Sequence, residues 1–261
     1  MEDKQQDRRV RAIYEDEMTT NTIYHGDSLQ VLKTLPDESI DCCVTSPPYN
    51  KHTANRKCRA NDTWVNANIS YGDFKDNLPE DIYQKQQRDI IQELVRIIKP
   101  TGSIFYNHKI RIKNHRTIIP TEWLSDFNIR QVLVWDRMNS PQLSPIRWFP
   151  STEYIYWITK ANIQPKFYKR SKHQMEVLRI PPKPYKNHPA PFPEELVEAL
   201  MINTTDAGDI VVDPFAGSGT TCVVAKRLER NYIGIELNPA YIKLAEERIA
   251  KEKTLFNDHH S

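Results

Sequence analysis

Residues 210–221 read IVVDPFAGSGTT, and this stretch decides the fold class. The apolar run IVV precedes a loop that contains Gly217 and Gly219, and the run TTCVVAKRLER that follows predicts a helix. Glycines at such a junction let the backbone turn sharply and approach a ligand, because they carry no Cβ. The amides of a helix that begins near Thr220 point back at the loop. The stretch therefore predicts a strand, a loop and a helix that together cradle a small ligand.

The next run, NYIGIE, predicts a second strand that ends at Glu236. An acid about 20 residues beyond a glycine loop is placed to accept hydrogen bonds from two ribose hydroxyls. A P-loop is excluded because no Gly-Lys-Ser/Thr follows, and Cys222 stands where the nicotinamide fingerprint has its third glycine. Strand and helix patterns alternate along the chain, which predicts an α/β fold. We expect a Rossmann-like, mainly parallel sheet with helices on both faces.

A second motif, TSPPYN at residues 45–50, closes the apolar run IDCCV. Ser46 Oγ and the main-chain carbonyl of Pro47 are hydrogen-bond acceptors on a turn that two prolines stiffen. Acceptors for both hydrogens of an exocyclic amino group help its delocalised nitrogen to become a nucleophile. Tyr49 offers a flat face for a planar base, worth about 1–3 kcal/mol of stacking. The alternative is a strand-ending turn with a core tyrosine.

Together the two motifs resemble those of the S-adenosylmethionine-dependent DNA amino-methyltransferases, with residues 213–236 similar position by position. Their order, catalytic motif first, resembles the circularly permuted beta group of that family. The resemblance spans about residues 22–252 and implies S-adenosyl-L-methionine as cofactor. The catalytic residues that it implies are Ser46, Pro47, Pro48 and Tyr49. The cofactor-binding residues that it implies are Asp27, Pro189, Phe192, Asp213, Phe215, Gly217, Gly219, Thr220 and Glu236.

Two of these assignments have a structural alternative. Asp27, in YHGDSLQVL, is also suited to cap the helix that follows it. Pro189 and Phe192 belong to HPAPFP, which reads equally as a stiff extended linker. In the family a similar proline-punctuated segment packs over the methionine end of the cofactor.

The family methylates either the N4 amino group of cytosine or the N6 amino group of adenine. Ser46 resembles the cytosine type, whereas adenine enzymes more often carry Asp there, so we expect N4 methylation of a flipped cytosine. N6-adenine methylation is the alternative, because both side chains accept from an amino group; RNA methylation is less favoured. Ring-carbon chemistry is not expected because none of the four cysteines follows a proline. The H-x-E and P-C-x-x-C motifs of zinc deaminases are absent.

We expect five parts along the chain: a charged N-terminal segment (1–20), a catalytic half (21–160), a basic target-recognition stretch (161–187), a cofactor-binding half (188–252) and a tail (253–261). The target-recognition stretch is a small insertion into the fold. Between residues 160 and 188, eight Lys or Arg face one acid, with interleaved aromatics and prolines. This mixture suits a loop on a phosphate backbone.

The candidate DNA contacts are Lys166, Lys169, Arg170 and Lys172, with a solvated basic loop as the alternative. A formal net charge of +2 means that a DNA surface must come from clustering. The expected partners are double-stranded DNA, a second copy of the chain in a homodimer and a cognate restriction endonuclease. Cysteine spacing predicts no metal site. No apolar run approaches the ~20 residues of a membrane span, and no signal peptide is expected, which predicts a cytoplasmic protein. The resemblance implies a bacterial, archaeal or phage-encoded protein that acts at the nucleoid.

Overall fold

The computed structural model describes residues 18–50, 77–113, 115–140, 145–146, 148–182 and 192–254. Within them, eight strands form one sheet, whose order from one edge to the other is β1 (Thr22–His25), β10 (Asn231–Glu236), β9 (Ile210–Asp213), β2 (Ile40–Thr45), β3 (Ile98–His108), β7 (Thr152–Ile158), β6 (Ile129–Asp136) and β8 (Val177–Arg179). Neighbouring strands are parallel except where β7 pairs, antiparallel, with β3 and β6. The predicted α/β fold with a mainly parallel sheet is confirmed.

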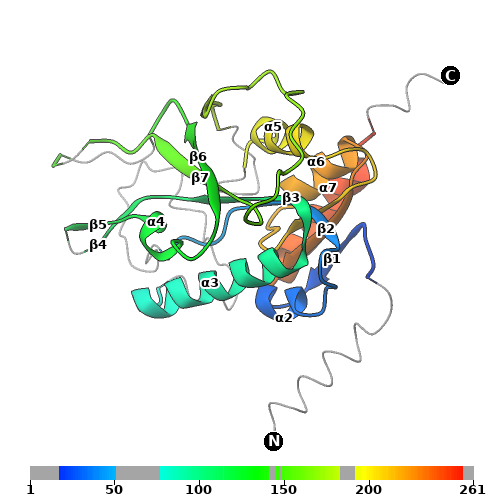
Figure 1. Ribbon diagram of the computed structural model, residues 1–261, viewed down its shortest axis with the longest axis horizontal. Coiled ribbons are helices and arrows are strands. Elements are labelled where there is room, and N and C mark those ends of the chain that lie inside the picture. Colours follow the sequence, from blue (N-terminus) through cyan, green and yellow to red (C-terminus); the bar gives the residue numbers. More distant parts are fainter. Residues whose placement is uncertain are drawn as a thin grey trace, which may run out of the picture.

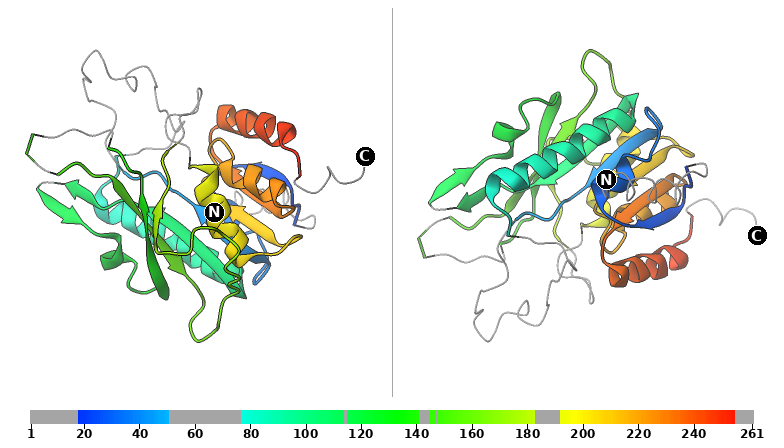
Figure 2. Two further views of the ribbon diagram at one scale, coloured as in Figure 1. Left: turned by 90° about the horizontal axis from the view of Figure 1, so that it is seen from above. Right: turned by 90° about the horizontal axis from the view of Figure 1, so that it is seen from below.

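Helices cover both faces of the sheet (Figure 1). On one face lie α2 (Ser28–Leu32), α3 (Glu80–Ile97) and α4 (Pro120–Trp123). On the other lie α5 (Glu194–Thr204), α6 (Thr220–Arg227) and α7 (Pro239–Lys251). Figure 2 shows α6 and α7 side by side, with the sheet between them and α3. A separate two-stranded sheet pairs β4 (Arg111–Lys113) with β5 (Arg116–Ile118).

The apolar runs of the sequence are strands buried on both faces. In β2, Cys42 and Val44 belong to the core beneath α5 and α6, whereas Cys43 belongs to the core beneath α2 and α3. Side chains alternate between the two faces of a strand, so a central strand needs apolar residues in succession. Burial raises the pKa of the Cys42 thiol to about 12, which keeps it protonated and agrees with a core role. Cys58 lies outside the described residues.

The basic stretch contains a strand that the sequence did not predict. Val177–Arg179 forms β8 and pairs in parallel with β6, at the edge of the main sheet. Leu178 and Ile180 are buried in the core beneath α5. Residues 177–180 therefore belong to the fold and pack like the rest of the sheet. None of the described helices combines the length and apolar composition that a bilayer crossing requires.

Candidate active site

The two motifs meet at the carboxyl edge of the sheet, which is the edge formed by the carboxyl ends of the parallel strands β2, β9 and β10. Thr45 is the last residue of β2, and Asp213 is the last residue of β9. Thr45 Oγ1 donates a 2.7 Å hydrogen bond to Asp213 Oδ1, although 168 positions separate the two residues. Ligands of open α/β sheets bind outside the carboxyl ends of the strands. This edge is therefore the candidate site.

The loop between β9 and α6 turns through left-handed backbone. Gly217 has φ 51° and Gly219 has φ 77°. Residues other than glycine adopt this backbone region at a cost in free energy. A Cβ at Gly219 would also stand 2.7 Å from the Cβ of Ala245 on α7. The loop thus requires glycine at residue 219 for its conformation and for its packing. Gly219 is the N-cap of α6, so Thr220 begins that helix as predicted.

Glu236 closes this loop from β10. Its Oε2 accepts from the Gly217 amide at 2.8 Å, and its Oε1 accepts from the Asn238 amide at 2.8 Å. Burial raises the pKa of Glu236 above its usual value, while these amides oppose the shift. A carboxylate has about four acceptor positions, so this one retains acceptor capacity beyond its backbone amides. Two ribose hydroxyls would supply such donors.

Asp213 lies behind the loop. It is buried, and its Oδ1 accepts from Thr45 and from the Phe215 amide at 3.0 Å. Burial raises the pKa of Asp213 from 3.8 to about 6, although the hydrogen bond from Thr45 lowers it. Asp213 therefore couples the loop to the end of β2.

Arg248 of α7 braces the same loop and was not found from the sequence. Its Nη1 donates to Ser218 O at 2.6 Å, to Ser218 Oγ at 2.9 Å and to Thr220 Oγ1 at 3.2 Å. Its Nη2 donates to Glu194 at 3.0 Å. Arg248 lies in an ordinary charged helical run about 30 positions after the loop, and no motif marks it.

The turn after β2 presents Ser46 and Tyr49. Ser46 Oγ lies 2.6 Å from Tyr49 Oη, and the Tyr49 ring lies 5.0 Å from the His108 ring, tilted by 59°. The Pro48 carbonyl accepts from Tyr83 Oη at 2.8 Å, which ties the turn to α3. Asn50 ends the turn in left-handed backbone, with φ 54°, and its Nδ2 donates to Leu78 O at 3.0 Å. Contacts on both sides thus fix the turn that carries Ser46.

Two further residues of the site, Asn107 and Glu153, were not predicted. Asn107 Nδ2 donates to Tyr49 Oη at 2.6 Å and to Glu153 Oε2 at 2.8 Å, and Tyr49 Oη donates to the same Oε2 at 2.8 Å. Glu153 is buried beside two cations: Lys109 Nζ lies 2.8 Å and Arg137 Nη1 3.2 Å from its Oε1. Burial would raise the pKa of Glu153, but Lys109 and Arg137 hold it below its usual value.

The site thus joins a glycine loop to a polar turn at one sheet edge. Comparison with known proteins shows that the family N6_N4_Mtase, described as DNA methylase, matches residues 40–247. The chain belongs to this DNA methylase family. The Type II methyltransferase M.HinfI of Haemophilus influenzae is 32% identical over 91% of this chain and 70% of its own length.

Solved structures share the fold of this DNA methylase. The PvuII DNA methyltransferase (cytosine-N4-specific) aligns with a TM-score of 0.69, at 23% identity, over 93% of this chain and 88% of that chain. The complex of M1.HpyAVI with SAM aligns with a TM-score of 0.59, at 23% identity, over 87% of this chain and 98% of that chain. At this identity the likeness concerns the fold alone.

The remaining residues predicted to contact the cofactor are Asp27, Phe192, Phe215 and Pro189, and they have different surroundings. Asp27 follows β1 and caps α2, where its Oδ1 accepts from the Gln30 amide at 3.1 Å. Phe215 is partly buried against the core beneath α2 and α3. The Phe192 ring meets Trp135 edge-on at 6.0 Å. Pro189 lies outside the described residues. Contact of these four residues with the cofactor stays a prediction.

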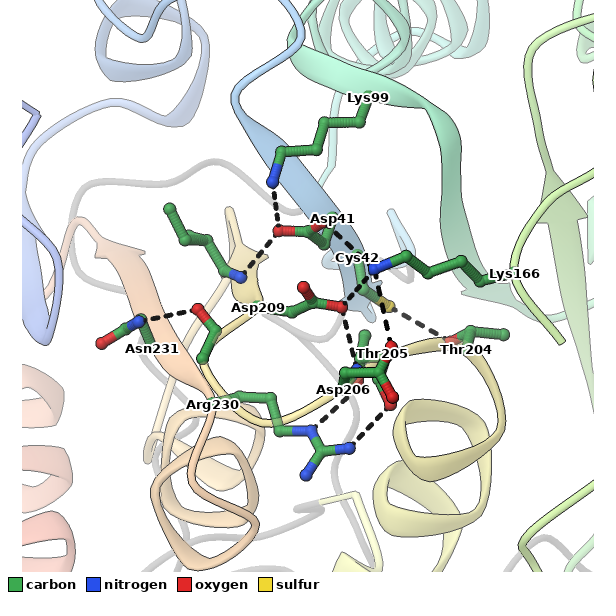
Figure 3. A network of polar contacts seen from close by, with 12 residues as sticks. Asp41, Cys42, Lys99, Lys166, Thr204, Thr205, Asp206, Asp209, Arg230 and Asn231 are labelled. Atoms are coloured by element: carbon green, nitrogen blue, oxygen red, sulfur yellow. Dashed lines mark hydrogen bonds and ion pairs between the residues drawn. The ribbon is translucent and has the colours of Figure 1, made fainter. Parts of the chain in front are cut away.

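The structure does not bring the predicted DNA contacts of the basic stretch to this edge. Figure 3 shows Lys166 in a polar network with Asp41 and Asp209, which lie at the amino ends of β2 and β9. Lys166 Nζ donates to Asp209 Oδ2 at 2.9 Å. Arg170 and Lys172 likewise have acidic partners, Asp206 at 2.9 Å and Glu195 at 2.7 Å, whereas Lys169 is exposed.

The amino ends of parallel strands lie at the opposite edge of the sheet from the carboxyl ends. The network around Lys166 is therefore separated from Ser46 and Glu236 by the length of the strands. Its ion pairs hold the basic stretch against α5 and β9. Binding of DNA by Lys166, Lys169, Arg170 and Lys172 stays a prediction.

Proposed function

We propose that this methylase is a site-specific enzyme of the beta group that transfers a methyl group from S-adenosyl-L-methionine to the N4 amino group of a cytosine flipped out of duplex DNA. The observation that carries this proposal is the junction of the two motifs. The bond between Thr45 and Asp213 sets the acceptor Ser46 beside the loop that holds Gly217. A methyl donor in the loop and an amino acceptor at Ser46 would then be neighbours.

S-adenosyl-L-methionine is the cofactor, and the residues of the loop edge fit it. Gly217 and Gly219 give a backbone without side chains at the turn, and Glu236 retains acceptor capacity for ribose hydroxyls. Asp213 and Arg248 hold the loop from behind. When bound, the cofactor supplies a methyl group on a positively charged sulfur. The buried carboxylates of Asp213 and Glu236 favour a ligand of positive charge.

Ser46, Pro47 and Tyr49 perform the chemistry on the base. Ser46 Oγ and the Pro47 carbonyl would accept from the two amino hydrogens, so the nitrogen lone pair becomes available to a methyl donor. The carbon–nitrogen bond would form as the carbon–sulfur bond of the donor breaks, and the amino group would then lose one proton to solvent. The ring of Tyr49 stacks on the extruded base, and His108 supports it from within the protein. Tyr83 of α3 donates to the Pro48 carbonyl, which fixes the position of the turn relative to α3. No covalent intermediate is needed.

The choice of cytosine rests on Ser46, the residue that resembles the cytosine type. The N6 amino group of adenine is the second candidate, because the family spans N6 and N4 methylases. The motif order supports the beta group. M.HinfI is a Type II methyltransferase, so we infer a bacterial restriction–modification setting in the cytoplasm, with a cognate endonuclease. The beta group often dimerises, so we also propose a homodimer as the active form.

The test is the identity of the methylated nucleoside. Purified protein is incubated with S-adenosyl-L-methionine and unmethylated, mixed-sequence duplex DNA, which is then digested and analysed by mass spectrometry. N4-methylcytosine is expected. N6-methyladenine would overturn the inference from Ser46 and leave the fold and the site unchanged.

A further inference from the structure

A partly buried series of hydrogen bonds, the polar chain, links Ser46 to Glu153 through Tyr49. It forms because β7 runs antiparallel to β3 and pairs Tyr154 with His108. Glu153 therefore enters the sheet at the carboxyl edge, where β2 delivers Ser46. No sequence motif connects these positions, which lie about 100 residues apart.

The direction of each hydrogen bond in this chain follows from what each group can donate. An ionised carboxylate only accepts, so Tyr49 Oη must give its single proton to Glu153 Oε2, 2.8 Å away. The same phenol oxygen accepts from Asn107 Nδ2 at 2.6 Å. Ser46, 2.6 Å from that oxygen, then has to donate its hydroxyl proton to Tyr49.

The amide of Asn107 agrees with this direction. Its Nδ2 faces Glu153 Oε2 at 2.8 Å, and the opposite amide orientation would set an oxygen against the carboxylate. Its two hydrogens are used by Glu153 and Tyr49, so its 3.4 Å approach to Ser46 Oγ is long for a hydrogen bond. Ser46 Oγ thus keeps lone pairs for a donor that is not part of this hydrogen-bonded series.

Glu153 is held in the ionised form that this arrangement requires. Lys109 and Arg137 both bind its second oxygen, Oε1. These cations lower the pKa of Glu153 against the effect of burial, which makes it a stable acceptor and a poor base. A protonated Glu153 would offer a donor of its own and free Tyr49 to donate to Ser46.

We propose that Glu153 is a positioning residue, which fixes the polarity of the chain Ser46–Tyr49–Glu153 so that Ser46 Oγ presents lone pairs to the amino group of the target base. This inference rests on the proposed amino-methyl transfer at Ser46. It assigns Glu153 no contact with the substrate and no proton transfer. Asn107, Lys109 and Arg137 hold Glu153 in place and ionised.

Glu153→Gln is the decisive substitution. Its amide oxygen will turn to the two cations, Lys109 and Arg137, and its NH2 group will face Tyr49 and reverse the chain. We expect kcat to fall by about 10- to 100-fold, the scale of a hydrogen bond to a charged group. The KM for S-adenosyl-L-methionine should stay within about 2-fold, because the loop is untouched.

Glu80→Gln is the matched control. Glu80 is also a carboxylate paired with an arginine and a lysine, Arg111 and Lys113, but these partners lie outside the chain from Ser46 to Glu153. The variant should retain kcat within about 2-fold. If Glu153→Gln does not fold, Glu153→Gln combined with Lys109→Met keeps the local charge balanced and carries the same expectation for kcat.

A double-mutant cycle with Tyr49→Phe shows whether Glu153→Gln lowers kcat through the direction of the hydrogen bonds or through a structural disturbance of the site. The phenylalanine keeps the ring but cuts the chain, so adding Glu153→Gln should change kcat by less than about 2-fold. Equal losses in both backgrounds, or wild-type kcat for Glu153→Gln, would overturn the inference. Wild-type protein that binds cofactor but methylates no DNA would instead count against the proposed function.

Discussion

Replacing Asp213 with Asn should change the pH dependence of folding stability. Asp213 is buried at the end of β9, and its Oδ1 accepts from Thr45 and from the Phe215 amide. The asparagine side chain keeps an oxygen for both donors but cannot ionise. The substitution therefore isolates the free-energy cost of a buried charge.

The magnitude follows from the pKa of Asp213, which burial raises from 3.8 to about 6. A group whose pKa is raised in the folded state stabilises the protein at low pH, and this stability is lost as pH rises from about 4 through about 6. The whole effect is about 3 kcal/mol. About 1.5 kcal/mol of it falls between pH 5 and pH 8.

The assay is urea denaturation of the wild-type protein and of Asp213→Asn at pH 5 and at pH 8. The difference between the two proteins cancels the contribution of titrating groups that do not interact with Asp213. We expect the variant to gain about 1.5 kcal/mol over the wild type on going from pH 5 to pH 8. A stability difference that does not change with pH would refute the reasoning.

Three further predictions concern the site and its supports. Ser46→Ala and Tyr49→Ala should each lower methyl transfer by at least about 100-fold and leave the Kd for S-adenosyl-L-methionine within about 3-fold, as measured by label incorporation and calorimetry; a parallel loss of cofactor binding would contradict this. Gly219→Ala should cost about 2 kcal/mol more in urea denaturation than Gly208→Ala. Both glycines have positive φ, 77° and 84°, but a Cβ at Gly208 meets nothing within 4 Å; equal costs would show that packing against α7 is unimportant. Lys166→Met should lower stability by about 1 kcal/mol through its lost ion pair and, as a predicted DNA contact, should weaken binding to duplex DNA with a shallower salt dependence; unchanged binding and salt dependence would show that this lysine serves the fold alone.

The central part of the fold could be predicted because its signals are local. The composition of IDCCV and of the apolar run before Gly217 predicts strands, and both runs form strands. Strand β10 begins and ends where the sequence predicts. Asn238 followed by Pro239 is a local signal for the start of a helix, and Asn238 caps α7 with its side chain accepting from the Ala240 amide. Each of these signals depends on residues next to one another in the chain.

The rest depends on contacts between distant segments. Val177–Arg179 is a strand because β6 offers it an edge, and its basic surroundings read as a solvated loop. Glu153 has a role only because β7 runs antiparallel and begins at the carboxyl edge. The charge of Lys166 predicts a DNA contact, whereas its ion pairs with Asp206 and Asp209, in the turn between α5 and β9, exist only in the folded chain. Sequence patterns do not carry these long-range pairings.

The measurement that tests the central claim most directly is transfer of a labelled methyl group from S-adenosyl-L-methionine. Unmethylated duplex DNA and bulk RNA are offered separately to the wild-type protein and to Ser46→Ala. The account predicts label in the exocyclic amino group of a DNA base with the wild type, and at least about 100-fold less with Ser46→Ala. Label in RNA alone, or undiminished labelling of DNA by Ser46→Ala, would contradict it.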